Sequence, residues 1–140
     1  MTVTLKIRLL HWLMVFFIVI NLFIFDDGDT IHVWVGYGSL LIILPRLFLG
    51  LTGSGHAAPN RIAFFAYVVF WGLVIGLGVS GILLVHFEDF FGAQNIENAH
   101  DLMAKAVIVF IIVHFSGIII DSILHHRKTW MAMISGKKSV

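Results

Sequence analysis

Four long apolar stretches constrain the fold of this 140-residue chain more than any other feature of its sequence. A helix needs about 20 mostly apolar residues to cross the hydrocarbon core of a bilayer, and each stretch reaches that length. Short polar segments with turn-forming residues separate the stretches. We therefore predict an all-α fold, an integral membrane four-helix bundle that forms a single domain over residues 1–140. The four expected spans are about Leu5–Phe25, Ile31–Leu51, Ile62–Val85 and about Ala99–Leu124.

Composition excludes several other classes of protein. Hydrophobic residues make up 59% of the chain and charged residues only 12%, whereas soluble domains carry about 25% charged residues. A soluble fold of this length has too little interior to bury so many apolar side chains. The chain contains no cysteine, which excludes disulfides, iron–sulfur clusters and thiolate zinc sites. Its net charge of +1 provides no basic field, so we expect membrane lipid and no nucleic acid among its partners.

The basic residues predict how the bundle is oriented, because the cytoplasmic segments of membrane proteins are enriched in Lys and Arg. Eight of the nine basic residues fall on one side of the predicted bundle: Lys6, Arg8, Arg46, Arg61, Arg127, Lys128, Lys137 and Lys138. The other side has Lys105 as its one nearby cation and carries an acidic set: Asp26, Asp27, Asp29, Glu88, Asp89, Glu97 and Asp101. Both termini are therefore predicted to be cytoplasmic. No small-x-small cleavage pattern follows the first span, so we expect that span to remain in the mature chain.

Four histidines lie inside or at the ends of the predicted spans, where polar side chains are costly and usually functional: His11, His32, His100 and His114. The last two are fourteen residues apart. This spacing falls about 40° short of four full turns, so both share one helix face about 21 Å apart. We expect His32 at the outer level of His100, and His11 at the inner level of His114. The pattern predicts two bis-histidine sites stacked across the bilayer, as a pair of b-type haems requires.

A haem fits these pairs better than a bare metal ion does. Two imidazoles leave zinc or copper under-coordinated, whereas a porphyrin brings four nitrogens of its own to the iron. Space beside the ligands is expected at Gly36, four residues after His32, and at Gly117, three residues after His114. The haem propionates need cationic partners, and the candidates are Arg8 and Arg46 at the inner side and Lys105 near the outer site.

Simpler roles remain open for these residues. A single membrane histidine can merely hydrogen-bond to a neighbouring helix, and Arg46 can extend to the inner lipid headgroups. His86, at the outer end of the third span, is an alternative ligand in place of His32 or His100. The remaining histidines are expected in solvated cytoplasmic segments: His56, His125 and His126.

Several segments form an ordered set of motifs along the chain. Arg8-Leu9-Leu10-His11-Trp12 lies in the first span, and Ile31-His32-Val33-Trp34-Val35-Gly36-Tyr37-Gly38 lies in the second, with Arg46 beyond it. The fourth span and the tail contribute His100-Asp101, His114, His126-Arg127 and Met133-Ile134-Ser135-Gly136-Lys137. This set resembles the bacterial cytochrome b561 family, whose members include the b-type subunits of nickel–iron hydrogenases and the superoxide oxidase type.

The resemblance implies that the four histidines bind two haems b in a multi-pass protein of the bacterial inner (cytoplasmic) membrane. It also implies that electrons pass between the membrane quinone pool and a redox partner. The acidic outer side favours a basic partner, such as a periplasmic cytochrome c or another basic redox protein. Two alternatives stay open, namely a superoxide oxidase that passes electrons from superoxide to quinone, and a structural membrane subunit without redox activity.

Overall fold

The computed structural model describes residues 5–26, 28–51, 61–87, 92–126, 128 and 130–136. These residues form five helices and no strand: α1 (Leu5–Phe23), α2 (Thr30–Leu51), α3 (Arg61–His86), α5 (Ala93–Leu124) and α6 (Met131–Ser135). Four of the five are long and apolar enough to cross a membrane. The prediction of an all-α bundle with four membrane-length helices is therefore confirmed.

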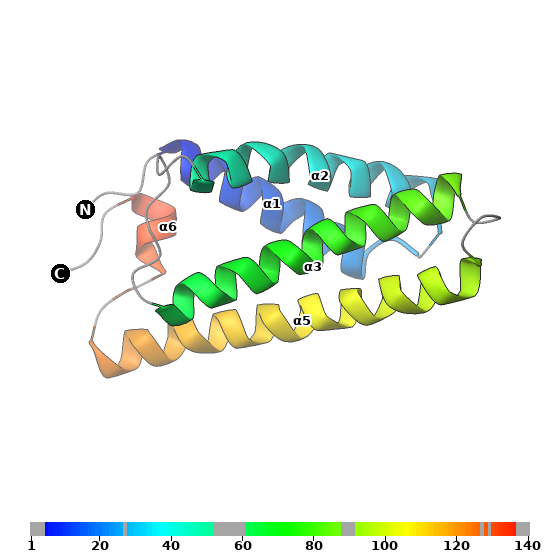
Figure 1. Ribbon diagram of the computed structural model, residues 1–140. Coiled ribbons are helices and arrows are strands. Elements are labelled where there is room, and N and C mark those ends of the chain that lie inside the picture. The colour runs from blue at the N-terminus through cyan, green and yellow to red at the C-terminus, as the bar shows by residue number, and fades with distance from the viewer. Residues whose placement is uncertain are drawn as a thin grey trace.

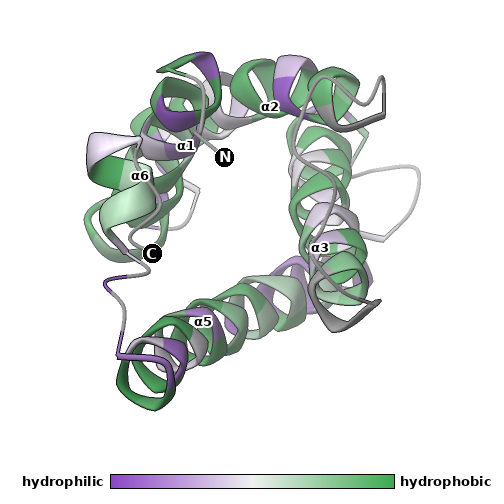
Figure 2. Ribbon diagram, turned by 90° about the vertical axis from the view of Figure 1, so that its left-hand side faces the viewer, coloured by the Kyte–Doolittle hydropathy of each residue, from purple (hydrophilic) through white to green (hydrophobic). Residues whose placement is uncertain are grey.

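The four long helices run side by side and alternate in direction (Figure 1). Helix α1 packs against α2, α2 packs against α3, and α3 packs against α5. Viewed along the bundle, the four helices surround a common interior, and α6 lies beside α1 at one end (Figure 2). We call this the α6 end, and the opposite end, where α3 ends and α5 begins, the far end.

Burial in the bundle is concentrated in one layer near its middle. This central core contains residues from all four long helices: Met14, Ile43, Trp71, Val74 and Val107. Outside it, large apolar side chains point away from the bundle, and Phe65 and Leu102 are 68% and 69% exposed. So extensive an apolar surface is unfavourable in water and is satisfied by lipid. The distribution of apolar side chains thus matches a protein that spans a bilayer.

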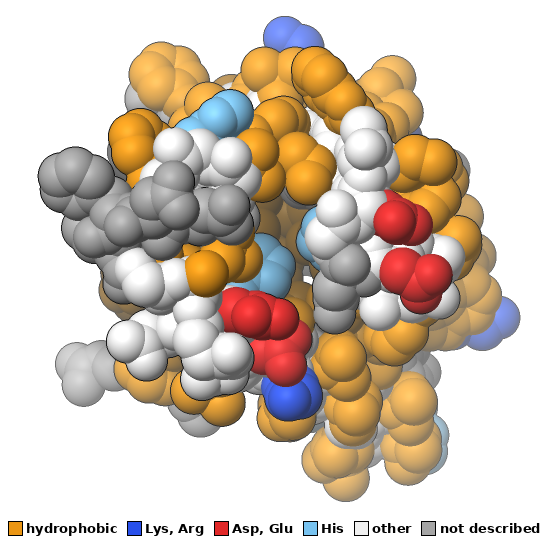
Figure 3. Space-filling model, turned by 90° about the vertical axis from the view of Figure 1, so that its right-hand side faces the viewer, with side chains coloured by type: hydrophobic (Ala, Val, Ile, Leu, Met, Phe, Trp, Pro, Cys, Tyr) orange, Lys and Arg blue, Asp and Glu red, His pale blue; other side chains and the backbone are white. Residues whose placement is uncertain are grey.

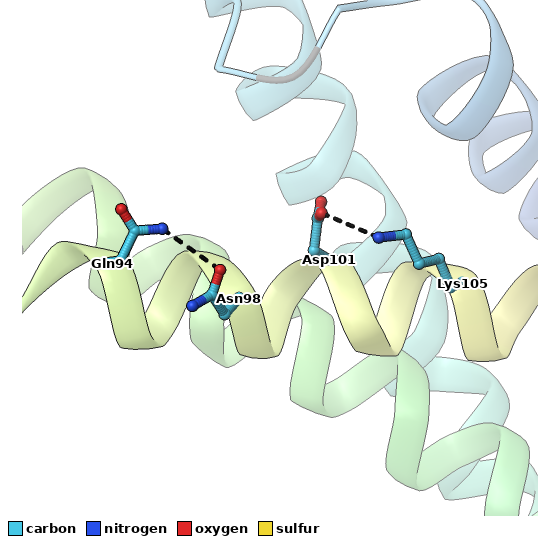
Figure 4. A network of polar contacts seen from close by, with 4 residues as sticks. All are labelled: Gln94, Asn98, Asp101 and Lys105. Atoms are coloured by element: carbon cyan, nitrogen blue, oxygen red, sulfur yellow. Dashed lines mark hydrogen bonds and ion pairs between the residues drawn. The ribbon is translucent and has the colours of Figure 1, made fainter.

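Helix α5 begins earlier than the sequence predicts. It starts at Ala93, after Gly92 with a φ of 76°, rather than near Ala99. The polar first turns are stabilised within the helix, since the Gln94 side-chain amide donates to the Asn98 side-chain oxygen at 3.3 Å (Figure 4). His100 therefore lies two turns inside α5 instead of at its start, and the helix projects beyond its apolar segment.

The short helix α6 was absent from the sequence prediction, and side chains of α1 hold it in place. The Arg8 guanidinium Nη1 donates to the Ile134 carbonyl oxygen at 2.6 Å, and the Trp12 indole Nε1 donates to the Met133 carbonyl oxygen at 3.0 Å. These bonds satisfy carbonyl groups that the end of a helix leaves without an internal partner. The C-terminal segment is thereby attached to the beginning of α1.

Several residues used in the sequence analysis lie outside the described residues. They are Asp27, Glu88, Asp89, His56, Arg127, Lys137 and Lys138, together with the side chain of Arg61.

Candidate functional site

A cavity of about 260 Å³ lies in the far-end half of the bundle, and all four long helices contribute to its wall. Its lining is mostly apolar. The polar and ionisable groups in the wall include Asn21, His32, Tyr37, His100, Asp101 and Lys105. Viewed from the far end, the bundle is hollowed, with histidine side chains in the hollow and acidic side chains around it (Figure 3). An apolar cavity with a few convergent polar groups is the usual form of a cofactor site.

His32 on α2 and His100 on α5 face each other across this region. Their ring centroids are 6.2 Å apart, with 62° between the ring planes. A metal–imidazole bond is about 2.0 Å long, so two in line separate the nitrogens by roughly 4 Å, and half a ring at each end brings the centroids to about 6 Å. The observed separation therefore suits one metal atom held between the two rings.

Ser80 on α3 positions the His100 ring. Its hydroxyl oxygen lies 2.8 Å from His100 Nδ1, and its hydroxyl donates to the Gly76 carbonyl oxygen, also at 2.8 Å. A hydroxyl has one proton to donate, so with that proton on Gly76 the Ser80 oxygen accepts from the Nδ1–H of His100. This tautomer places the imidazole lone pair on Nε2, which is the arrangement a metal-binding histidine requires.

Glycines provide room in the same half of the bundle. Gly36 lines the cavity, and a Cβ there would stand 3.7 Å from the Asn21 amide nitrogen. A Cβ at Gly81 would stand 3.6 Å from Cε1 of His100. At Gly78 a Cβ would overlap the Leu40 side chain, so a larger residue there would require Leu40 to move. Gly36 thus lies where the sequence analysis expects space for a large planar group.

The second histidine pair lies in the half of the bundle nearer to α6. His11 on α1 lies three residues before Met14 of the central core, and His114 on α5 lies seven residues after Val107. The His114 ring stacks on Phe110, with centroids 6.2 Å apart and 9° between planes. Val107 of the central core stands midway between His100 and His114 along α5. His11 and His114 therefore lie on the α6 side of the central core, opposite His32 and His100, and their pairing stays a prediction.

Gly117 differs from Gly36 in its surroundings. It lies on an exposed part of α5, and a Cβ built there meets no atom within 4 Å. The surrounding helices do not crowd this position.

The three candidate cations have different neighbours. The Arg46 guanidinium carbon lies 5.7 Å from the centroid of the Tyr67 ring. Arg8 donates to the tail helix through Nη1, while its Nε is buried with no hydrogen-bond partner among the described residues. Lys105 lines the far-end cavity and forms an ion pair with Asp101 at 3.3 Å (Figure 4). The carboxylate of Asp101 therefore offsets part of the charge of Lys105.

His86 has a partner other than the histidine pair. Its Nε2 lies 3.0 Å from the Tyr37 hydroxyl, which links the far end of α3 to α2. The ring that faces His32 is that of His100. The structure thus pairs His32 with His100, and His86 takes the place of neither. At the α6 end, His125 is exposed and its Nδ1 lies 3.1 Å from the Asp121 carboxylate.

The sequence analysis did not single out two polar residues that belong to this site, Asn21 and Ser80. Ser80 is 6% exposed, and the Asn21 side-chain oxygen is buried with no hydrogen-bond partner in the described part of the chain. Both residues lie inside apolar spans, where a polar side chain is costly and so indicates function. Both residues therefore carry in the sequence the same signal as the membrane histidines.

The donor set suits a haem rather than a bare metal ion. Among residues 5–26, 28–51, 61–87, 92–126, 128 and 130–136, no group of three or more His, Asp or Glu side chains is arranged to hold a metal ion. Two facing imidazoles suffice for haem iron, because the porphyrin supplies the other four nitrogens. The buried Asn21 oxygen and the glycine-lined wall provide further groups that a haem in this cavity would contact.

Comparison with protein families gives one informative match. The family described as prokaryotic cytochrome b561 matches residues 2–136, almost the whole chain. Comparisons with curated proteins and with solved structures gave no match.

Proposed function

Because this chain belongs to the prokaryotic cytochrome b561 family, and is thus a multi-pass membrane b-type cytochrome, we propose that it passes electrons across the bilayer through two haems b. The observation that carries this proposal is the pair of imidazole rings at 6.2 Å across a cavity lined by all four long helices. Each haem supplies a reversible one-electron change at its iron. The chain would supply the histidine ligands, a largely apolar surrounding and local charge.

His32 and His100 hold the far-end haem in this proposal, and His11 and His114 hold the haem nearer to α6. Along α5 the two ligand levels are fourteen residues, or about 21 Å, apart. The hydrocarbon core is about 30 Å thick, so two cofactors at these levels divide the crossing into short electron-transfer steps. Ser80 orients His100, and Phe110 stacks on His114, so both α5 ligands have second contacts that fix their rings.

We further propose that the α6 end faces the cytoplasm and the far end faces the periplasm, across a bacterial inner membrane. The support is the Lys and Arg distribution along the sequence, since basic segments stay on the cytoplasmic side. Acidic side chains gather at the far end (Figure 3). Those among the described residues are Asp26, Asp29, Glu97 and Asp101.

The periplasmic partner proposed here is a basic redox protein such as a c-type cytochrome, and the membrane partner is the quinone pool. Acidic side chains around the far-end cavity attract a lysine-rich surface and repel small anions. Superoxide oxidation is the second candidate function, and one observation favours it. Lys105 lines the cavity with a side chain that is 73% exposed, so a cation is available beside the far-end site. Its ion pair with Asp101 weakens that attraction, and we therefore favour the basic protein partner.

Vesicles test the proposed function. The purified protein is inserted into lipid vesicles that contain ferricyanide, and a membrane-impermeant reductant is added outside. We expect the trapped ferricyanide to be reduced, and the His100→Ala variant to lose this reaction. The matched control is His86→Ala, which removes an imidazole at the same end of the bundle and should retain it. Haem-loaded protein that reduces no trapped ferricyanide would contradict the proposal.

A further inference from the structure

A group of hydrogen-bond donors without acceptors lies in the half of the bundle nearer to α6. The Tyr67 hydroxyl and the Trp71 indole Nε1 are both buried and have no hydrogen-bond partner among the described residues. Trp71 is only 4% exposed, so bulk solvent does not reach its indole N–H. Buried polar groups in proteins are almost always hydrogen-bonded, and an exception requires an explanation such as a ligand.

These donors are close to one another and to a cation. The Tyr67 and Trp71 rings meet edge to face at 5.4 Å, and the Arg46 guanidinium carbon lies 5.7 Å from the Tyr67 centroid. Arg46 lies within a membrane span, and no carboxylate in the described part of the chain forms an ion pair with it. Charged side chains inside membranes are stable when an opposite charge accompanies them. We call Arg46, Tyr67 and Trp71 the donor cluster.

The chemistry of the donor cluster selects its ligand. An indole N–H, a phenol O–H and a guanidinium together match an ionised carboxylate, which accepts several hydrogen bonds and neutralises the cation. A quinone carbonyl accepts hydrogen bonds but leaves the arginine charge uncompensated. A quinone would also have to enter from the lipid, whereas Trp71 belongs to the central core.

The position of the cluster indicates which carboxylate it holds. Arg46 on α2 lies in the same half of the bundle as His11 on α1. Trp71 contacts Phe70, whose ring lies 4.9 Å from that of Phe110, and Phe110 stacks on His114. The cluster, formed by two residues of α3 and one of α2, is therefore connected through aromatic rings to His114. We infer that Tyr67 and Trp71, together with Arg46, bind a propionate of the haem held by His11 and His114, an assignment that rests on the proposed function.

Conservative substitutions test the inference by redox potentiometry on purified protein with both haems bound. Tyr67→Phe removes only the hydroxyl and keeps the ring under Arg46. Without that donor the propionate charge acts more strongly on the iron and favours the ferric state. At a fixed potential we expect the ferric-to-ferrous ratio of the α6-end haem to rise about three- to tenfold, where tenfold corresponds to about 59 mV for a one-electron couple.

Trp71→Phe should shift the same haem in the same direction and leave the far-end haem unchanged. Its matched control is Trp34→Phe, at a tryptophan that is 68% exposed, and both potentials should stay at their wild-type values there. Haem labelled with ¹³C in its propionates adds a second readout. We expect the labelled carboxylate band in the redox-difference infrared spectrum to shift in Tyr67→Phe and not in Trp34→Phe.

Each other outcome overturns the assignment. Unchanged potentials and an unchanged carboxylate band in Tyr67→Phe, with two haems bound, would refute the donor cluster as a propionate site and leave the proposed function standing. Weakened quinone binding with unchanged haem properties would assign the cluster to a quinone instead. A wild-type protein that binds only one haem would refute the proposed function and the propionate assignment together.

Discussion

Removing the Ser80 hydroxyl tests the role of His100 most selectively. Ser80→Ala deletes one oxygen from a side chain that is 6% exposed and leaves the imidazole in place. The Nδ1–H of His100 then loses its acceptor at 2.8 Å, and the ring loses the contact that fixes its tautomer and orientation. We therefore expect weaker binding of the far-end haem alone.

The size of the effect follows from the burial of this bond. A buried donor that loses its partner costs about 1–3 kcal/mol, which is about five- to 150-fold in an equilibrium constant. Substitution of a residue that orients a metal ligand typically lowers metal affinity about 10- to 100-fold, which falls within that range. The hydrogen bond that Nδ1–H donates to Ser80 also makes the imidazole more electron-rich and favours ferric iron. Its loss should therefore raise the midpoint potential of the far-end haem.

Haem titration of the apoprotein, followed by potentiometry, measures both effects. The matched control is Ser122→Ala, which removes a hydroxyl that donates to the Ile118 carbonyl oxygen of its own helix at 2.7 Å. This control should bind both haems with wild-type affinity. If Ser80→Ala did the same, and both potentials were unchanged, the reasoning that Ser80 holds His100 as an axial ligand would be refuted.

Three further predictions concern charge and packing. Arg46→Gln should lower the midpoint potential of the α6-end haem, because a nearby cation favours the added electron. For an assumed charge separation of roughly 10 Å and an effective dielectric constant near 20, the effect is about 1–2 kcal/mol. An unchanged potential in a redox titration would favour lipid headgroup contact instead. Gly78→Ala should lower the free energy of unfolding by about 1–3 kcal/mol, since the new Cβ overlaps the Leu40 side chain. Gly72→Ala should leave the free energy of unfolding unchanged, because a Cβ built there meets no atom within 4 Å. Electron exchange with a basic c-type cytochrome should slow steeply as salt rises in stopped-flow measurements. Fast haem reduction by superoxide that is lost in Lys105→Gln would instead establish the superoxide oxidase alternative.

The sequence predicted the architecture well, because membrane spans depend on local length and apolarity. Each of the four long helices overlaps its predicted span. The histidine levels were also predictable, since the spacing of His100 and His114 fixes their positions along one helix. The structure brings the ring of His32 to that of His100, as the depth argument predicts, whereas the pairing of His11 with His114 stays a prediction. Their roles as haem ligands stay predictions.

Contacts between helices could not be predicted in the same way. The bonds of Ser80 to His100 and of Tyr37 to His86 join residues 20 and 49 positions apart, and they form only after the helices pack. The early start of α5 depends on a side-chain bond in a polar segment, which a criterion of apolar length ignores. Helix α6 is too short to be predicted from periodicity, and its position depends on bonds from α1.

Haem content in paired histidine variants tests the central claim most directly. The claim is that His32 and His100 share one haem, and that His11 and His114 share the other. The double variant His32→Ala/His100→Ala should retain one haem per chain, whereas His32→Ala/His114→Ala should retain none, against two in the wild type. One haem in the second double variant, or none in the first, would contradict the pairing, and two haems in either would show that these histidines are not the ligands.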